Sequence, residues 1–286
     1  MSASCGRLEF PQNRSRTTES ARAAIATPIT PIVQSRAEPV DLPFVLDLAN
    51  EVADKIDARF ERVRARVADS ASRVGRPPES VTLVAVTKLV PLELIRDAIA
   101  LGHRVFGENR VQEALPKIDE LSSVAPDIRW HLVGHLQTNK AKLAAERFAM
   151  VESVDSVRLA SRLDARAASL SRRLPVLLEV NVAGEPSKWG FCPHEVGAAV
   201  TEISQLPHLE IRGLMTVAPL GRHAEDVRWA FRALRQLRDD LRERIASLQL
   251  PELSMGMSHD FEVAIEEGAT IVRIGRALFG ERLPAR

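Results

Sequence analysis

Tyrosine is absent from this sequence of 286 residues, and cysteine occurs only twice, as Cys5 and Cys192. Two cysteines so far apart do not resemble the disulfide framework of a small secreted domain, so a reducing compartment is expected. The 39 basic and 38 acidic residues leave a formal net charge of +1, without the basic excess typical of nucleic-acid-binding proteins. The sequence also lacks an apolar run of the roughly 18 residues that span a membrane, and the apolar core of a signal peptide. We therefore expect a cytoplasmic protein whose partners are neither nucleic acids nor membranes.

The first 41 residues differ in composition from the rest of the chain. They are rich in serine, threonine, proline and arginine, and they show no sustained periodicity. Because too few apolar residues recur there to bury a face, we expect residues 1–41 to form a disordered extension. An organelle transit peptide is the alternative interpretation of this arginine-containing segment. Residues 42–286 are expected to form a single domain.

From Leu42 onward, helices and strands are predicted to alternate. A long helix is predicted over Phe44–Val74, where the sequence GRPP stops it, and the β-branched run Val81–Lys88 predicts a strand buried on both faces. Seven further strands are predicted over Arg104–Gly107, Trp130–Val133, Val151–Val154, Pro175–Val182, Ile211–Val217, Glu252–Met255 and Ile271–Ile274. Helical patterns separate all of them, and two of these predicted helices cover Thr138–Phe148 and Ala224–Ser247. Eight such units in about 210 residues predict an α/β fold, namely a single (β/α)8 barrel of the TIM type with parallel strands.

Lys88 is unusual among the six lysines of the chain because it alone ends an apolar strand. In a barrel of this type the ligand lies at the carboxyl ends of the strands, so the Lys88 amine is expected at the barrel mouth. Partial burial lowers the pKa of an amine, and a neutral amine is the form that makes an imine with a carbonyl group. A lysine with a buried stem and a solvated ammonium is the alternative.

Two glycine-containing loops predict an anion site. Strand seven runs into the sequence SMGMS and strand eight into RIGRALFG. In (β/α)8 barrels the loops after these two strands commonly bind phosphate, and glycine lets backbone N–H groups approach the anion. Gly256, Ser258 and Gly275 occupy the positions that such a site requires. Ordinary turns also use glycine and serine, so the combination of both loops with Lys88 is what favours a phosphate-bearing ligand.

A metal centre is not expected. His131 and His135 are four residues apart, but they lie on a strand and the loop after it rather than on a helix. His194 and Glu195 begin like a zinc-protease motif, but Ala198 stands where the second histidine is required.

Several longer motifs occur in the same order as in a known protein family. They are VAVTK, FGENRVQE, WHLVGHLQTNK, EVNVAGEPSKWGF, RGLMTV and SMGMSHDFEVAIEEGATIVRIGRALFGER, between about Phe44 and Glu281. With these motifs the chain resembles the pyridoxal phosphate homeostasis protein family, also called YggS or PROSC proteins, which is related to the N-terminal barrel of alanine racemase. Two features depart from the family pattern. One is the extension of 41 residues, and the other is Leu283, near which many members have a tyrosine.

The resemblance implies pyridoxal 5′-phosphate as the cofactor, held by Lys88 as a Schiff base. It places Asn109 beside the cofactor ring and Arg273 opposite the pyridine nitrogen, where a permanent cation makes the ring a poorer electron sink. It also implies three phosphate-binding residues, Ser258, Gly275 and Arg276.

Three functions are compatible with these residues. The favoured one is a monomeric carrier without catalysis, which buffers the cofactor and passes it to apo-enzymes. An amino-acid racemase is the alternative, but racemisation needs bases on both faces of the substrate, and in alanine racemase the second base is a tyrosine from a further domain. This chain has no tyrosine and about six residues after the barrel. A phosphate-binding barrel enzyme unrelated to pyridoxal chemistry would leave Lys88 without a role.

Overall fold

The computed structural model describes residues 42–245 and 247–280, with the backbone alone for residues 42–55. The predicted disordered extension, residues 1–41, lies outside the described residues. The eight strands of the described part are β1 Thr82–Val86, β2 Val105–Glu108, β3 Arg129–Leu132, β4 Met150–Val154, β5 Leu174–Glu179, β6 Leu209–Met215, β7 Glu252–Ser254 and β8 Ile271–Ile274. The helices are α1 Leu42–Arg73, α2 Leu92–Ala100, α3 Val111–Leu121, α4 Ala141–Arg147, α5 Val157–Ser169, α6 Val196–Ile203, α7 Arg228–Arg244, α8 Phe261–Glu266 and α9 Arg276–Phe279. Short 3-10 turns cover Pro78–Ser80, Thr138–Lys140 and Ala224–Val227.

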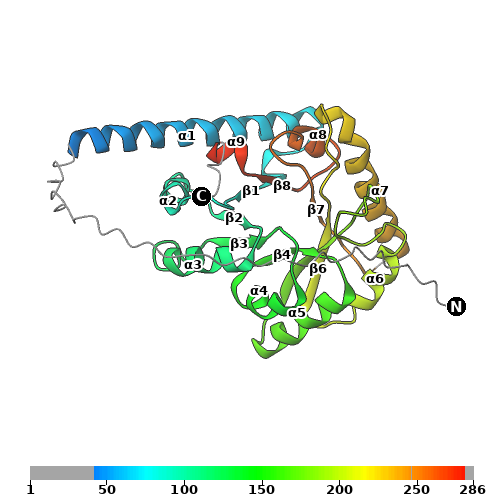
Figure 1. Ribbon diagram of the computed structural model, residues 1–286. Coiled ribbons are helices and arrows are strands. Elements are labelled where there is room, and N and C mark those ends of the chain that lie inside the picture. The colour runs from blue at the N-terminus through cyan, green and yellow to red at the C-terminus, as the bar shows by residue number, and fades with distance from the viewer. Residues whose placement is uncertain (1–41, 246, 281–286) are drawn as a thin grey trace, which may run out of the picture. The chain divides into compact units, whose positions relative to one another are not determined.

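The strands close into a parallel barrel in sequence order, which confirms the predicted (β/α)8 fold (Figure 1). Closure is made by β1 and β8, where Thr82 pairs with Ile271 and Val84 with Arg273. Alternate residues point inward, and seven apolar side chains fill the inside of the barrel: Val84, Val86, Val105, Val133, Leu177, Met215 and Ile271. The other face of each strand packs against the helices, where β-branched and leucine side chains form the larger core.

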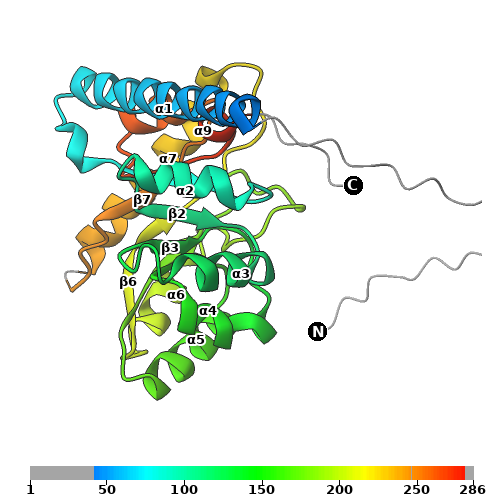
Figure 2. The same cartoon turned by 90° about the vertical axis from the view of Figure 1, so that its left-hand side faces the viewer.

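Helix α1 takes the place that an eighth outer helix would occupy. Within the described residues, strand β8 is followed by the single turn α9, and α1 contacts α2, α8 and α9 (Figures 1 and 2). Its buried side chains recur every three or four residues, the spacing of one helix face: Ile56, Phe60, Val63, Val67 and Ala71. Helix α1 is therefore part of the outer helical layer of the barrel.

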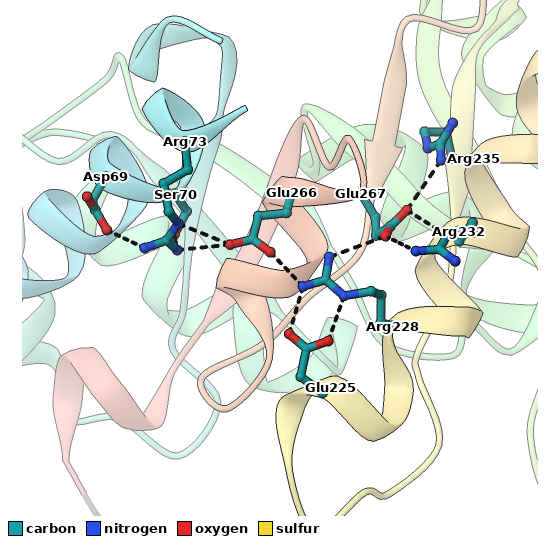
Figure 3. Close-up of polar contacts among 9 residues, drawn as sticks. All are labelled: Asp69, Ser70, Arg73, Glu225, Arg228, Arg232, Arg235, Glu266 and Glu267. Carbon is teal, nitrogen blue, oxygen red and sulfur yellow. Dashed lines mark hydrogen bonds and ion pairs between the residues drawn. The ribbon is translucent and has the colours of Figure 1, made fainter. Parts of the chain in front are cut away.

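A chain of ion pairs links α1 to α8 and α7 on the outside of the barrel (Figure 3). Arg73 contacts Asp69 on its own helix at 2.5 Å and Glu266 at 3.0 Å. The second oxygen of Glu266 accepts a hydrogen bond from Arg228 at 2.6 Å. Glu267 accepts hydrogen bonds from three arginines of α7, namely Arg228, Arg232 and Arg235.

Two predicted helices are divided in the structure. The helix expected over residues 138–148 begins with a 3-10 turn before α4, and the one expected over residues 224–247 consists of a 3-10 turn and α7, which ends at Arg244. Asp226 shapes the start of this 3-10 turn, because its carboxylate accepts hydrogen bonds from the backbone N–H groups of Arg222 and His223. Among residues 42–245 and 247–280, no helix has both the length and the apolar character needed to cross a membrane.

Candidate functional site

Lys88 lies at the carboxyl end of β1, at the mouth of the barrel. It follows Val84 and Val86 at alternate positions, and both of these belong to the inner apolar cluster. The residue is half-buried, as the prediction from its strand-end position requires. The next residue, Leu89, has a φ of 58°, a left-handed conformation that is uncommon for a leucine and that turns the chain away from the strand.

A buried ion pair behind the strand fixes the backbone next to Lys88. Lys117, on α3, donates one hydrogen bond to the Thr87 carbonyl oxygen at 2.6 Å and another to Glu108 at 2.7 Å. The Thr87 hydroxyl also donates to Glu108, at 2.7 Å. In the sequence, Lys117 lies in a predicted helix among polar residues. Nothing in that position indicated that it would anchor the end of β1.

Inside the barrel, a polar chain crosses from β3 to β8. Nδ1 of His131 lies 2.6 Å from one oxygen of Glu152, and the other oxygen accepts a hydrogen bond from the Ser254 hydroxyl at 2.6 Å. Arg273 donates to that hydroxyl at 2.5 Å and to the Thr216 carbonyl oxygen at 2.8 Å. All of these side chains are buried, so Arg273 is held in one position below the mouth.

Positive and negative side chains alternate along this buried polar chain. Burial alone would raise the pKa of Glu152, but the hydrogen bond with His131 and the charges of His131 and Arg273 hold it below its usual value. Burial lowers the pKa of Arg273, and the negative charges of Glu152, Glu179 and Asp260 oppose that effect. A guanidinium stays protonated in proteins, so Arg273 presents a permanent cation near the mouth.

Glu179 is a site residue that the sequence reasoning missed. It ends β5, two residues after the inward-facing Leu177, and only 8% of its surface is exposed. Burial, and after it the charge of Asp155, raise the pKa of its carboxyl to about 7, and the charge of Arg273 partly opposes them. The position at the carboxyl end of an apolar strand, as for Lys88, was the signal available in the sequence.

The two loops expected to bind phosphate are in contact. The Ser258 hydroxyl, in the loop after β7, accepts a hydrogen bond from the backbone N–H of Ala277 at 3.2 Å. Gly256 has a φ of 94°, and a Cβ there would lie 2.6 Å from the Ala264 side chain, so glycine is required at this position. Gly275 has a φ of −117°, which other residues also adopt, so its backbone conformation does not by itself require glycine.

The remaining predicted residues lie on the same end of the barrel. Asn109 is half-buried after β2 and lines a cavity of about 460 Å³ together with Gly134, His135 and Lys140. Arg276 is exposed, and its Nη1 lies 3.1 Å from Nε2 of His259. The structure thus brings the six predicted residues to one end of the barrel, and their roles in binding stay predictions.

The two histidines considered as a metal pair have other partners. His131 is paired with Glu152, whereas His135 lies 2.9 Å from Asp155 and stacks on Trp189 with ring centroids 3.7 Å apart. Within the described ranges, no cluster of histidine, cysteine and acidic residues is suited to hold a metal ion.

Comparison with known proteins places the chain in a family. Residues 59–283 match the model of the alanine racemase N-terminal domain. The pyridoxal phosphate homeostasis protein of Aquifex aeolicus is 46% identical over 224 residues, which are 78% of this chain and 97% of that protein. The corresponding protein of Pseudomonas aeruginosa is 44% identical over 227 residues, 79% of this chain and 96% of its own. The chain belongs to the pyridoxal phosphate homeostasis protein family.

Solved structures agree with this membership. PipY of Synechococcus elongatus, solved with pyridoxal phosphate bound, is 44% identical, with a TM-score of 0.67 over 75% of this chain and all of that one. The same protein without the cofactor gives 46% identity and a TM-score of 0.69. Alanine racemase of Clostridium difficile is only 14% identical, with a TM-score of 0.62, and that likeness shows the fold alone.

Proposed function

We propose that this family member binds pyridoxal 5′-phosphate and serves in its intracellular homeostasis, with Lys88 as the covalent attachment point. The observation that carries the proposal is the place of Lys88, half-buried at the barrel mouth in line with the inward-facing Val84 and Val86. Membership of the family supplies the cofactor class, because the related PipY structure has pyridoxal phosphate bound.

The residues at the mouth fit the polar groups of this cofactor. An amine is required for the aldehyde, and Lys88 supplies it. The joined loops at Ser258 and Gly275, with Arg276 beside them, offer hydroxyl, backbone N–H and guanidinium donors for the phosphate. Arg273 is a buried cation that can donate to the pyridine nitrogen. Asn109 lies in the loop after β2, the strand next to β1. Bound cofactor supplies an electrophilic carbon, and the chain supplies the amine and the anion site.

We further propose that the protein is a monomeric carrier that passes the cofactor to apo-enzymes rather than a catalyst. Two features support this role. Arg273, which we propose faces the pyridine nitrogen, would leave the ring a weaker electron sink, and the sequence has no tyrosine to act as a second base. His131 is buried and bound to Glu152, which disfavours it as a second base in place of a tyrosine.

Borohydride reduction tests the attachment. After reduction of the loaded protein and proteolysis, the phosphopyridoxyl group should lie on the peptide that contains Lys88, and Lys88→Ala should lose the visible absorption band. Lys142→Ala, an exposed lysine of α4, is the matched control and should keep both. Label found mainly on Lys188 or Lys140 would contradict the assignment.

A racemase is the second candidate function. The observation that favours testing it is the raised pKa of Glu179. A carboxyl with a pKa of about 7 at the mouth is able to exchange a proton. The carrier proposal expects no exchange of the α-proton of alanine, serine or glutamate in D2O beyond that caused by free cofactor. Exchange that disappears in both Lys88→Ala and Glu179→Gln would support the racemase instead.

A further inference from the structure

A groove lies between the helices α4 and α5 on the outside of the barrel. The two helices pack side by side (Figures 1 and 2), and the groove has a volume of about 590 Å³. Residues of the 3-10 turn before α4, of α4 and of α5 line it. Sites for small molecules have volumes of roughly 300–1,000 Å³, so this α4–α5 groove has the size of such a site.

The lining of the α4–α5 groove carries charge of one sign. Among the described residues that line it, four are basic and none is acidic. Arg158, Arg162 and Arg166 follow one another at intervals of four residues and therefore share one face of α5, and Lys142 stands on α4. The other polar residues of the lining are neutral: Thr138, Asn139 and Ser169.

Most of this positive charge has no partner within the described part of the chain. Arg166 forms an ion pair with Glu146 of α4. Arg158, Arg162 and Lys142 make no hydrogen bond or ion pair with another described residue. Like charges four residues apart on a helix repel each other, so the row of arginines on α5 is unfavourable without an anion beside it.

Helix α7 shows what a similar row of arginines binds in this protein. Three arginines of α7, spaced three or four residues apart, donate hydrogen bonds to one carboxylate, that of Glu267 (Figure 3). The α5 arginines instead face a groove that has no acidic residue in its lining. A ligand that carries its own negative charge would occupy the position that Glu267 has at α7.

Phosphate is the anion that best fits so many cations in so small a space. A phosphate monoester carries about −1.5 to −2 charges at pH 7, whereas a carboxylate carries one. The guanidinium group also binds phosphate through two parallel hydrogen bonds. We propose that the α4–α5 groove binds a small ligand with two or more adjacent phosphate groups, held by Arg158 and Arg162, with Lys142 on the α4 side. The lining of the groove includes none of the six residues predicted to bind the cofactor at the barrel mouth.

Isothermal titration calorimetry in buffer without Mg²⁺ tests this site. The protein is first loaded with pyridoxal phosphate and reduced with borohydride, so that the cofactor site is filled; if no cofactor is taken up, the unloaded protein is titrated in the same way. The ligands are tripolyphosphate and ATP. The double variant Arg158→Gln/Arg162→Gln removes two cations from the groove, and Arg62→Gln/Arg244→Gln removes two exposed cations from α1 and α7 as the matched control.

Wild type should bind one tripolyphosphate per chain. Loss of a single hydrogen bond to a charged group weakens binding about ten-fold or more, so the groove variant should bind at least ten-fold more weakly than wild type. The control variant has the same net charge as the groove variant and should bind as wild type does. Equal affinity for tripolyphosphate and ATP would mean that the phosphate chain alone is recognised, and tighter binding of ATP would add contacts of the nucleoside; both results support the site.

Three results would overturn the inference. The first is a wild-type protein that binds neither ligand at millimolar concentration, and the second is equal loss of affinity in the groove variant and in the control. The third is tighter binding of a hexaglutamate peptide than of tripolyphosphate, which would indicate an acidic protein segment as the ligand. If the double variant fails to fold, the exposed single substitutions Arg162→Gln and Arg62→Gln are compared instead, with the same criteria. None of these results depends on attachment of the cofactor to Lys88, which the borohydride label tests separately.

Discussion

Two polar networks hold different parts of this protein, one outside the barrel and one inside it. The outer network joins α1, α8 and α7, and most of its members are partly exposed, such as Asp69 at 67% and Arg73 at 48%. The inner chain links His131, Glu152 and Arg273, and it is buried. The outer network is redundant, since Glu267 accepts from three arginines, whereas each link of the inner chain is made once. Removing one member of the buried inner chain should therefore lower the free energy of unfolding strongly, whereas removing one member of the outer network should lower it little.

The largest loss in the free energy of unfolding is expected for Glu152→Gln. The amide leaves His131 and Arg273 without the buried negative charge between them, and removal of one partner from a buried charged group costs about 3–5 kcal/mol. Urea unfolding followed by circular dichroism measures the loss. Glu266→Gln, in the outer network, is the control and should cost less than a third as much. Similar losses in the two variants would contradict the distinction between the networks.

The second largest effect is expected for Lys117→Met, which should lower the free energy of unfolding by about 3 kcal/mol. The substitution leaves Glu108, which is fully buried, without a cation and releases the Thr87 carbonyl oxygen. Because Thr87 precedes Lys88, the rate of imine formation with pyridoxal phosphate should also fall. Lys142→Met, on the exposed side of α4, is the comparison. An unchanged unfolding midpoint would mean that the Lys117–Glu108 pair is not a structural link.

Acid should destabilise the interior through His103. Burial lowers the pKa of His103 to about 4, although its hydrogen bond with the Val105 carbonyl acts in the other direction. The unfolded chain takes up a proton near pH 6.5, so the stability from this group is complete above that pH and is lost as the pH falls to about 4. The loss over this window is about 3 kcal/mol. Urea midpoints between pH 7 and pH 4 should fall less steeply in His103→Gln, and parallel curves would refute this origin.

The smallest effect is expected for Arg73→Ala. Its pair with Asp69 is exposed to solvent and its pair with Glu266 is partly exposed, and such pairs contribute about 0.5 kcal/mol. Because salt screens exposed charges, the difference from wild type should vanish when unfolding is repeated in 1 M NaCl. A loss as large as that of Glu152→Gln would show that α1 depends on this link and not on its apolar face.

Much of the fold could be predicted from local patterns. The β-branched runs and the helical patterns between them predicted all eight strands within a few residues, because buried parallel strands are apolar along their whole length. The short helix α9 and the 3-10 turns at residues 138–140 and 224–227 were not separated, since side-chain hydrogen bonds such as those of Asp226 decide them. The sequence also contained no sign that α1 would complete the helical ring.

The site divides in the same way. The amino-acid sequence by itself determined the alternation of strands and helices, and hence the end of the barrel at which Lys88, Ser258 and Gly275 lie, because strand order and direction follow from the connections. Only the tertiary structure decided which side chains meet across the barrel. Glu152 reaches Ser254 and Glu179 stands opposite Lys88 because closure of the barrel brings together residues about 100 positions apart in the chain. No local pattern records such distances, and the same closure gives Glu179 its burial and raised pKa.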